Sequence, residues 1–425
     1  MLSRIDLIIS NLEKELRLDD QQLPHLGHNV SIPEGSLNLS GFDTTLFIGD
    51  NLIYLRELAH CSSEVIDLCY IDPPYNTGSN FIYNDTRKTK TGGIFGTHSS
   101  WMSFMLPRLV YAREMLKETG VISVSVDDYE QAYLKILMDK VFGEDNFIGS
   151  VIVCRSKNGK GSKNNLATNH EYLLIYGKSK QSRLRGQIDE TTYNKLDEFG
   201  LYRVDGLFRK KGAASLRADR PNMFYPLYYN PNNGKVSVEP IAGWPSVTPI
   251  DSKGVERRWL WGSDTANTRA WQLYASKNGV IYVKNYAGDA GTIKRTKVRT
   301  LWNDTSFYTE QATKEIKELF GIKIFDTPKP LSYIKKIIDI CSNSEAVILD
   351  FFAGSGTTAH AVAELNNIDR GNRKCILMET DCKIPLKHVA RDHDFERISD
   401  ITSRRLRMIQ SEYHSFKFQI VNPIN

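Results

Sequence analysis

The sequence contains no run approaching ~18 consecutive apolar residues, the length that a membrane-spanning helix requires. Its first residues, MLSRID, also lack the basic-then-apolar order of a secretory signal. We therefore expect a cytoplasmic protein that does not engage a membrane. The phosphate-binding patterns GxxxxGKS and GxxxxGKT are absent, which excludes P-loop ATPases and helicases. The chain shows neither an internal repeat nor a low-complexity tract.

Cysteine is scarce, with six residues in 425. The cysteines form no Cys-x-x-Cys pair and no dense cluster, so their spacing indicates neither a disulfide framework nor a zinc site. Buried free thiols in a reducing compartment explain them better, and we expect no bound metal. They are Cys61, Cys69, Cys154, Cys341, Cys375 and Cys382.

The net charge of +5 is modest, but its distribution is uneven. Residues 151–300 hold 26 lysines and arginines against 12 acidic residues, so this middle segment carries +14 and the remainder is acidic. A basic module of this kind is typical of a polyanion-binding surface. An ordinary lysine-rich soluble domain would also explain it. The overall content of 41% hydrophobic and 25% charged residues is that of a globular protein.

Strand-like and helical segments alternate along most of the chain, which favours a doubly wound, mostly parallel α/β sheet. The expected strands are 45–48, 65–71, 121–126, 147–154, 171–176, 346–350 and 375–378. The expected helices are 52–59, 101–118 (with Gly120 as its stop), 130–141, 314–320, 331–343, 357–366 and 397–411. The spacing of apolar residues from Ile5 to Leu16 predicts a further helix.

The alternation pauses in the middle of the chain. From about residue 180 to 300 the sequence is rich in Gly, Asn, Lys, Arg, Tyr and Trp, with short strand-like pieces. We therefore expect an N-terminal helical extension over 1–40 and one α/β domain formed by 41–180 and 301–425. An α+β insert over 181–300 interrupts that domain. Core packing explains its tryptophans better than base stacking: Trp244, Trp259, Trp261 and Trp271.

A carboxylate, two prolines and an aromatic residue follow the expected strand 65–71, as Asp72, Pro73, Pro74 and Tyr75. The prolines fix the backbone and remove competing donors. A fixed carboxylate and a backbone carbonyl could then accept both N–H groups of an exocyclic amine and free its lone pair. Tyr75 would offer a face on which a flipped base stacks. The alternative is a plain Pro-Pro turn at the surface.

A glycine turn between a strand and a helix, Phe352-Ala353-Gly354-Ser355-Gly356, follows Asp350. Glycines permit a ligand to approach the backbone closely, and a helix N-terminus favours a carboxylate. The spacing differs from the GxGxxG fingerprint, although a nicotinamide or nucleotide site stays open. Glu379 ends the next strand, where it could accept ribose hydroxyls; Asp381 and a solvated strand end are alternatives. Asp50 could similarly reach a cofactor adenine.

With these motifs, the chain resembles the β group of amino-DNA methyltransferases, in which the catalytic motif precedes the cofactor motif. More closely, it resembles the Mod subunit of type III restriction-modification systems. The matching strings are Ile48–Asn51, Tyr70–Gly78, Trp101–Leu109, Gly120–Asp128, Asn169–Tyr172, Arg220–Asn222, Thr300–Trp302, Phe325–Pro330 and Asp350–Thr357. Type III Mod subunits tend to be longer than the 425 residues of this chain, so a reduced recognition region and a solitary methyltransferase are the alternatives. No segment resembles an endonuclease.

The resemblance implies a Rossmann-like methyltransferase sheet in circularly permuted motif order, with the insert as a target-recognition domain. It implies S-adenosylmethionine as the methyl donor and adenine N6 in duplex DNA as the acceptor. In this permuted order Asp at the first catalytic position usually accompanies adenine, whereas Ser accompanies N4 of cytosine. N4-cytosine methylation and an inactive DNA-binding partner are the alternatives. We expect a homodimer, which a separate restriction subunit could accompany.

The candidate residues form three groups. The catalytic group is Asp72, Pro73, Pro74 and Tyr75. The cofactor group, in which the resemblance adds Thr327 and Lys329, is Asp50, Asp72, Thr327, Lys329, Asp350, Phe352, Gly354, Ser355, Gly356, Thr357 and Glu379. The phosphate-contacting group is Lys157, Lys160, Lys163, Arg209, Lys210, Lys211, Lys294, Arg295, Lys297 and Arg299. A solvated face would equally explain the run 294–299, and His170 is expected to be structural.

Overall fold

The computed structural model describes residues 41–76, 98–159, 166–188, 192–287 and 294–422. The chain divides into two compact units. The first unit comprises the described residues of Met1–Gln187 and Lys297–Asn425, and the second comprises those of Ile188–Thr296. The helix expected over 5–16 lies outside the described residues. Within the described residues, no helix is both long and apolar enough to cross a membrane.

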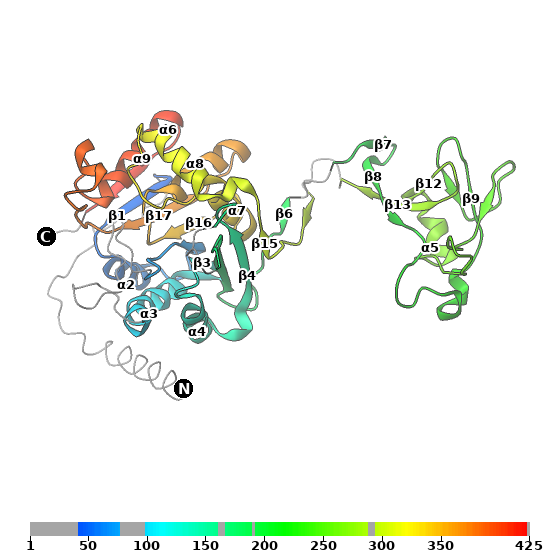
Figure 1. Cartoon of the computed structure of the whole chain (residues 1–425), viewed down its shortest axis with the longest axis horizontal. Helices are drawn as coiled ribbons and strands as arrows, with labels where there is room; N and C mark the ends of the chain where they lie inside the picture. Colours follow the sequence, from blue (N-terminus) through cyan, green and yellow to red (C-terminus); the bar gives the residue numbers. More distant parts are fainter. Residues whose placement is uncertain (1–40, 77–97, 160–165, 189–191, 288–293, 423–425) are drawn as a thin grey trace. The chain divides into compact units, whose positions relative to one another are not determined.

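The first unit is built on one mostly parallel sheet, whose nine described strands run in the order β15-β4-β5-β3-β2-β16-β17-β1-β18 (Figure 1). Neighbouring strands are parallel except β5, which is antiparallel to both β3 and β4. The bounds are Thr44–Ile48 (β1), Ile66–Ile71 (β2), Leu116–Val126 (β3), Phe147–Cys154 (β4), His170–Gly177 (β5), Leu301–Trp302 (β15), Val347–Asp350 (β16), Lys374–Glu379 (β17) and Phe418–Val421 (β18).

Helices cover both faces of this sheet. One face carries α2 (Asn51–Cys61), α3 (His98–Met115) and α4 (Gln131–Phe142), and the other carries α7 (Leu331–Cys341), α8 (Thr357–Asp369) and α9 (Ile398–Glu412). The amphipathic helix α6 (Thr309–Phe320) buries Ile316 in a separate small cluster. Because successive strand side chains point to opposite faces, Leu68 packs with the second group of helices and Cys69 with the first.

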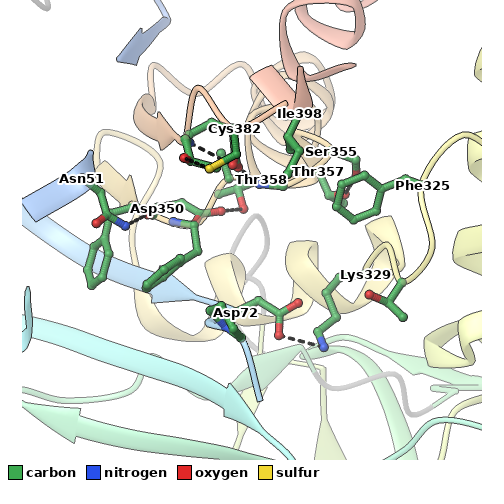
Figure 2. A pocket seen from close by; sticks show the side chains of 18 of the residues that line it. Asn51, Asp72, Phe325, Lys329, Asp350, Ser355, Thr357, Thr358, Cys382 and Ile398 are labelled. Carbon is green, nitrogen blue, oxygen red and sulfur yellow. Dashed lines mark hydrogen bonds and ion pairs between the residues drawn. The ribbon is translucent and has the colours of Figure 1, made fainter. Parts of the chain in front are cut away.

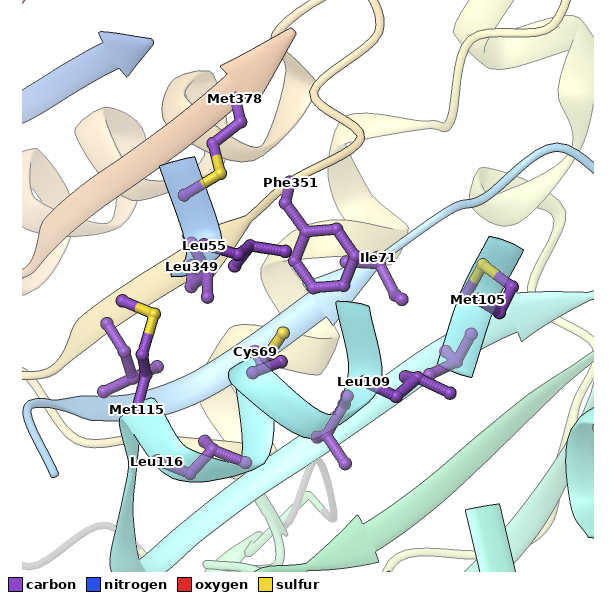
Figure 3. Close-up of a cluster of buried hydrophobic side chains, with 14 of the residues drawn as sticks. Leu55, Cys69, Ile71, Met105, Leu109, Met115, Leu116, Leu349, Phe351 and Met378 are labelled. Carbon is purple, nitrogen blue, oxygen red and sulfur yellow. The ribbon is translucent and has the colours of Figure 1, made fainter. Parts of the chain in front are cut away.

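The continuous apolar runs in the central strands follow from this double coverage. Cys69, Ile71 and Leu349 are fully buried and pack against Leu55 of α2 and Leu109 of α3 (Figure 3). A fully buried aliphatic side chain of this kind stabilises the fold by about 1.5–3 kcal/mol. The core therefore holds β2 and β16, whose ends carry the two motifs, in a fixed relation.

The prediction of a helix over 101–118 is wrong at the C-terminal end of that helix. It ends at Met115, and Gly120 lies inside β3 rather than terminating a helix. The pairing of β2 with β3 shifts register between Ile66 and Leu68, so the extra residues before Val121 form a bulge. A Cβ on Gly120 would lie 2.9 Å from the Lys117 carbonyl oxygen and 3.0 Å from the Ile66 carbonyl oxygen, which accounts for glycine in this bulge.

The crossovers from β2 and from β16 lead to opposite sides of the sheet. From β16 the chain passes through α8 to β17 on one side, whereas from β2 it passes through α3 to β3 on the other. In open α/β sheets this divergence leaves a crevice outside the carboxyl ends of the strands, where ligands bind. The two sequence motifs follow these two strands.

The described residues of the second unit form small antiparallel sheets, a short α-helix and three short 3-10 helices. Trp259 is 2% exposed and stacks on Phe208, so it packs the core of this unit, with Trp261 packed against it. Trp271 is instead partly exposed and lies against Phe199. The elements are β7 (Lys195–Asp197), β8 (Gly200–Leu207), β9 (Leu227–Tyr229), β10 (Val236–Ser237), β11 (Ser246–Val247), α5 (Ser263–Thr268), β12 (Leu273–Ala275) and β13 (Ile281–Tyr286), while β6 (Gln187–Ile188) pairs with β14 (Arg295–Thr296).

Candidate active site

Two motifs that lie 280 residues apart in the sequence meet at one edge of the sheet. Leu68 pairs with Ile348 and Cys69 with Leu349, so β2 and β16 are parallel neighbours that end together. The segments that follow them, from Asp72 and from Phe351, line the same cavity of about 1010 Å³ (Figure 2). This volume suits a nucleoside-sized ligand together with a second small group.

Most of the candidate cofactor and catalytic residues line this cavity, whereas Pro73, Tyr75 and Gly356 do not. The candidates that line it are Asp50, Asp72, Pro74, Thr327, Lys329, Asp350, Phe352, Gly354, Ser355, Thr357 and Glu379. Phe325 and Ile398 add apolar wall on the same cavity. The fold thus gathers these side chains from six separate stretches of sequence.

The Asp72 carboxylate is held through one of its two oxygens. Oδ1 accepts a hydrogen bond from the Tyr75 hydroxyl at 2.5 Å and lies 2.9 Å from the Lys329 ammonium nitrogen. Among the described residues, no group bonds to Oδ2. Burial raises the pKa of Asp72 and Glu171 adds to that shift, while Lys329 opposes it. The Trp101 indole N–H donates to the Pro74 carbonyl at 2.7 Å and thereby fixes the following backbone.

Lys329 connects Asp72 to a second ion pair. Its ammonium lies 3.1 Å from Glu171 Oε2 and donates to the Tyr75 hydroxyl at 2.6 Å. Glu171 Oε1 in turn lies 2.9 Å from the Arg155 guanidinium. The side chains of Lys329 and Glu171 are 9% and 8% exposed, so these charges interact with little screening by water.

The glycine turn adopts a conformation that requires glycine. Gly354 and Gly356 have φ angles of 53° and 80°, in the left-handed region. A Cβ on Gly354 would lie 3.3 Å from the Phe325 ring. The Thr402 hydroxyl donates to the Gly354 carbonyl at 2.6 Å, so α9 holds the turn from behind. The backbone of this turn is thereby kept open toward the cavity.

Two buried carboxyl groups flank the turn. Glu379 Oε2 accepts from the Gly354 N–H at 2.5 Å and Oε1 from the Thr380 N–H at 2.9 Å, and burial raises the pKa of Glu379 to about 8. Asp350 accepts from the Thr358 hydroxyl and the Phe352 N–H, and burial raises its pKa to about 7. The Asp381 carboxylate instead pairs with Arg397 and is half exposed. Glu379 is thus the buried one of the two acidic candidates at this strand end.

The hydroxyl groups of Ser355 and Thr357, beside the glycine turn, point toward the buried Arg405 on α9. Ser355 and Thr357 both accept hydrogen bonds from the buried Arg405 guanidinium, at 3.1 and 2.9 Å. Arg405 also contacts His360 on α8. These contacts indicate that both side chains stabilise the helix start as well as line the cavity.

Asp50 belongs to a network that sequence reasoning did not find. Asp50 Oδ1 accepts from the Leu52 N–H at 2.9 Å, which caps α2, and lies 3.0 Å from the Arg108 guanidinium. Arg108 also donates to the Asn51 side chain at 2.6 Å, and Asn51 donates to the Phe351 carbonyl at 2.6 Å. Burial lowers the pKa of Arg108 to about 10. Arg108 and Asn51 both line the cavity, and both occur in strings that carried the resemblance.

The candidate phosphate contacts are dispersed. Lys157, Lys211, Lys297 and Arg299 are exposed, while Lys160 and Lys163 lie outside the described residues. Lys294 instead donates to the Asn285 side chain and the Tyr286 carbonyl. Arg209 and Lys210 are partly buried in the second unit, as is Arg295, near its C-terminal end. Residues 188–296 hold 16 basic and 11 acidic residues, so much of the basic excess belongs to the flanking segments of the first unit.

A mostly parallel α/β sheet with buried carboxylates around a cavity at its topological switch point defines a cofactor-binding class of protein. Residues 66–383 match the family model described as DNA methylase, and the chain belongs to this family.

The chain is similar to the type II methyltransferase M.KpnI of Klebsiella pneumoniae, with 60% identity over 91% of this chain and 93% of that protein. The type III EcoPI Mod subunit of Escherichia phage P1 is 34% identical over 86% of this chain and 62% of the subunit. In identity the type II enzyme is therefore nearer than this type III subunit. A solved structure named PvuII DNA methyltransferase (cytosine-N4-specific) matches at 14% identity and a TM-score of 0.40, covering 87% and 93% of the two chains.

Proposed function

We propose that the protein transfers a methyl group from S-adenosylmethionine to N6 of adenine in a specific duplex DNA sequence. The observation that carries this proposal is the single cavity onto which both Asp72 and the glycine turn open. One wall offers a carboxylate oxygen to which none of the described residues is bonded, and the other offers a glycine backbone and buried carboxyl groups. A transfer between two ligands needs both walls within reach of each other.

The residues of the second wall fit S-adenosylmethionine. Glu379 is buried at the end of β17, where its oxygens retain lone pairs for two ribose hydroxyls besides the backbone N–H groups that they already accept. Phe352 and Phe325 supply apolar surface for an adenine ring. Gly354 leaves space that a Cβ would fill against Phe325. When bound, the cofactor supplies an electrophilic methyl group on a sulfonium.

In the proposed reaction, Asp72 is the side-chain acceptor for the target amine. Tyr75 and Lys329 fix Oδ1, which leaves Oδ2 to accept one N–H of the target amine. The Pro73 carbonyl accepts the other N–H, and both acceptors favour a pyramidal nitrogen with an available lone pair. The carboxylate also stabilises the positive charge that develops on this nitrogen. Tyr75 and the backbone held by Trp101 keep the carboxylate in place.

We assign target recognition to the second unit, as a domain inserted into a circularly permuted methyltransferase sheet. The order of β1, β17, β16 and β2 across the sheet, with the glycine turn late in the sequence, supports that assignment. The exposed basic residues would contact phosphates, and the target base would leave the stack at a cost of a few kcal/mol.

The 60% identity to a protein named as a type II methyltransferase supports a role as the modification enzyme of a restriction-modification system. A type III assignment has weaker support, since the similarity covers 62% of the Mod subunit. A homodimer stays a prediction.

The direct test uses purified protein, methyl-labelled S-adenosylmethionine and unmethylated phage DNA. Label that becomes bound to DNA, and that is abolished by prior digestion of the DNA to nucleosides, supports the proposal. Tight cofactor binding without transfer to any tested DNA would instead indicate an inactive DNA-binding partner.

A further inference from the structure

The reversed strand β5 brings a carboxylate to the catalytic edge of the sheet. Because β5 is antiparallel to β3 and β4, its first residues lie at the carboxyl ends of the parallel strands. Glu171 pairs with Val153 near the end of β4. Its side chain is 8% exposed and lies 3.1 Å from the Lys329 ammonium, although Glu171 does not line the cavity. A carboxylate that is buried beside the site without entering it requires a reason.

Four charged side chains form a row of three ion pairs whose net charge is zero. Two cations, Lys329 and Arg155, alternate with two carboxylates, Asp72 and Glu171, along contacts of 2.9, 3.1 and 2.9 Å. Arg155 is held independently, because its second nitrogen donates to the Thr309 hydroxyl at 3.3 Å. Glu171 is therefore fixed on one side by Arg155 and presents its other oxygen to Lys329.

We propose that Glu171 is a positioning residue for methyl transfer: it shares the Lys329 ammonium with Asp72, so that Asp72 is oriented by Lys329 without being fully neutralised by it. This inference rests on the proposed function, since it concerns the acceptor strength of Asp72 toward the target amine. An ammonium paired with Asp72 alone would weaken Oδ2 as an acceptor. A carboxylate opposite the ammonium restores that strength and still leaves Lys329 in place to hold Oδ1.

The charges around Asp72 support a readout in pH. Ionised Asp72 is the stronger acceptor for the amine and also stabilises the positive charge that develops on its nitrogen, so activity should fall as the pH drops through the pKa of Asp72. The titratable and charged groups around Asp72 come from several elements. They are Tyr70 on β2, Tyr75 after β2, Lys329 before α7, Tyr333 on α7, Glu171 on β5, Arg155 after β4 and Asp350 on β16. Glu171 raises the pKa of Asp72 and Lys329 lowers it. Removing the charge of Glu171 should therefore shift the acid limb to lower pH, and removing the charge of Lys329 should shift it to higher pH.

The first experiment measures methyl transfer to unmethylated phage DNA between pH 5 and 9. Glu171→Gln should lower kcat about tenfold and shift the acid limb of kcat/KM to lower pH, while the Kd for S-adenosylmethionine changes less than about threefold. Lys329→Met should shift the acid limb to higher pH. Glu171→Asp, which keeps the charge, should return the limb toward its wild-type position. A lower kcat with an unmoved acid limb in Glu171→Gln would overturn the proposal in favour of a structural role.

The matched control is Glu364→Gln. Glu364 is a partly buried glutamate whose carboxylate lies 2.8 Å from Lys335, and it does not line the cavity. This variant should keep the wild-type profile, because its lost ion pair lies between α7 and α8.

A second measurement does not depend on transfer. The carboxyl resonance of Asp72 can be assigned in protein labelled with ¹³C at aspartate Cγ, because it is missing from Asp72→Asn. Its titration should occur at lower pH in Glu171→Gln than in the wild type, and an unchanged titration refutes the inference. If the wild type methylates no DNA, the proposed function fails, and this titration still decides whether Glu171 controls Asp72.

Discussion

Replacing Asp72 with alanine is the perturbation whose consequence the structure specifies most fully. The substitution removes the carboxylate oxygen that faces the target amine. It also takes one acceptor from Tyr75 and one of two carboxylates from Lys329. Loss of a preorganised, charged acceptor in a water-poor site typically removes about 3 kcal/mol of transition-state stabilisation, which is more than a hundredfold in rate.

The cost to stability should be much smaller than the cost to rate. Lys329 keeps Glu171 as a partner at 3.1 Å, so its charge is not left unpaired. We expect the unfolding free energy to fall by about 1–2 kcal/mol, the cost of the lost hydrogen bonds of one partly buried carboxylate. The cofactor should still bind, because Glu379, Phe352 and the glycine turn are untouched.

Asp139→Ala is the matched control for this variant. Asp139 on α4 accepts from Lys135 at 2.7 Å and from the Tyr176 hydroxyl at 2.7 Å, the same two kinds of partner that Asp72 has, but lies outside the cavity. Both variants should lose comparable stability in thermal unfolding, and only Asp72→Ala should lose methyl transfer. The reasoning is refuted if Asp72→Ala keeps a rate within a few-fold of the wild type at saturating cofactor.

Further expectations concern the cofactor and the DNA. Because burial raises the pKa of Glu379 to about 8, the group is mostly protonated at pH 7 in the free protein, whereas its ionised form is the stronger acceptor for ribose hydroxyls. Binding of S-adenosylmethionine should therefore release a proton from Glu379 in most molecules at pH 7 and tighten as the pH rises toward 8. Calorimetry in buffers of different ionisation enthalpy should find this release missing in Glu379→Gln, and equal release in both proteins would contradict the assignment. Reversing the exposed charges Lys297 and Arg299 to glutamate should weaken DNA binding across sequences and lower the salt slope by about 1–2. Lys294→Glu is the comparison, since the Lys294 ammonium is already bonded within the protein; an unchanged slope in the double variant would mean that the DNA lies elsewhere.

The sequence was sufficient to predict the elements that carry the site. Apolar runs of strand length, followed by Asp72 or by the glycine turn, identified β2 and β16 and their order relative to the helices. The cavity residues at the ends of these two strands could be predicted because parallel strands end at a common edge, whereas Thr327 and Lys329 came only from the family resemblance. A residue that directly follows a parallel strand lies at the carboxyl edge of the sheet, so its place can be predicted from the sequence.

Features that depend on which strands pair, and in which direction, could not be predicted from the sequence pattern. No local signal shows that β5 runs antiparallel, so Glu171 was not recognised as a neighbour of Lys329. Gly120 follows a helical pattern and was interpreted as a helix stop, whereas it lies in a strand bulge where a Cβ would crowd the carbonyl oxygens of Lys117 and of Ile66 on the neighbouring strand. Arg108 lies on a helix whose apolar spacing gives no hint that one arginine turns inward to Asp50.

The identity of the methylated base tests the central claim most directly. DNA methylated by the purified protein with labelled S-adenosylmethionine is digested to nucleosides, which are separated by chromatography and identified by mass. We expect to find the label in N6-methyladenine, and we expect Asp72→Ala to produce none. Label found in N4-methylcytosine without N6-methyladenine would contradict the adenine assignment, and label found in neither would contradict the reaction itself.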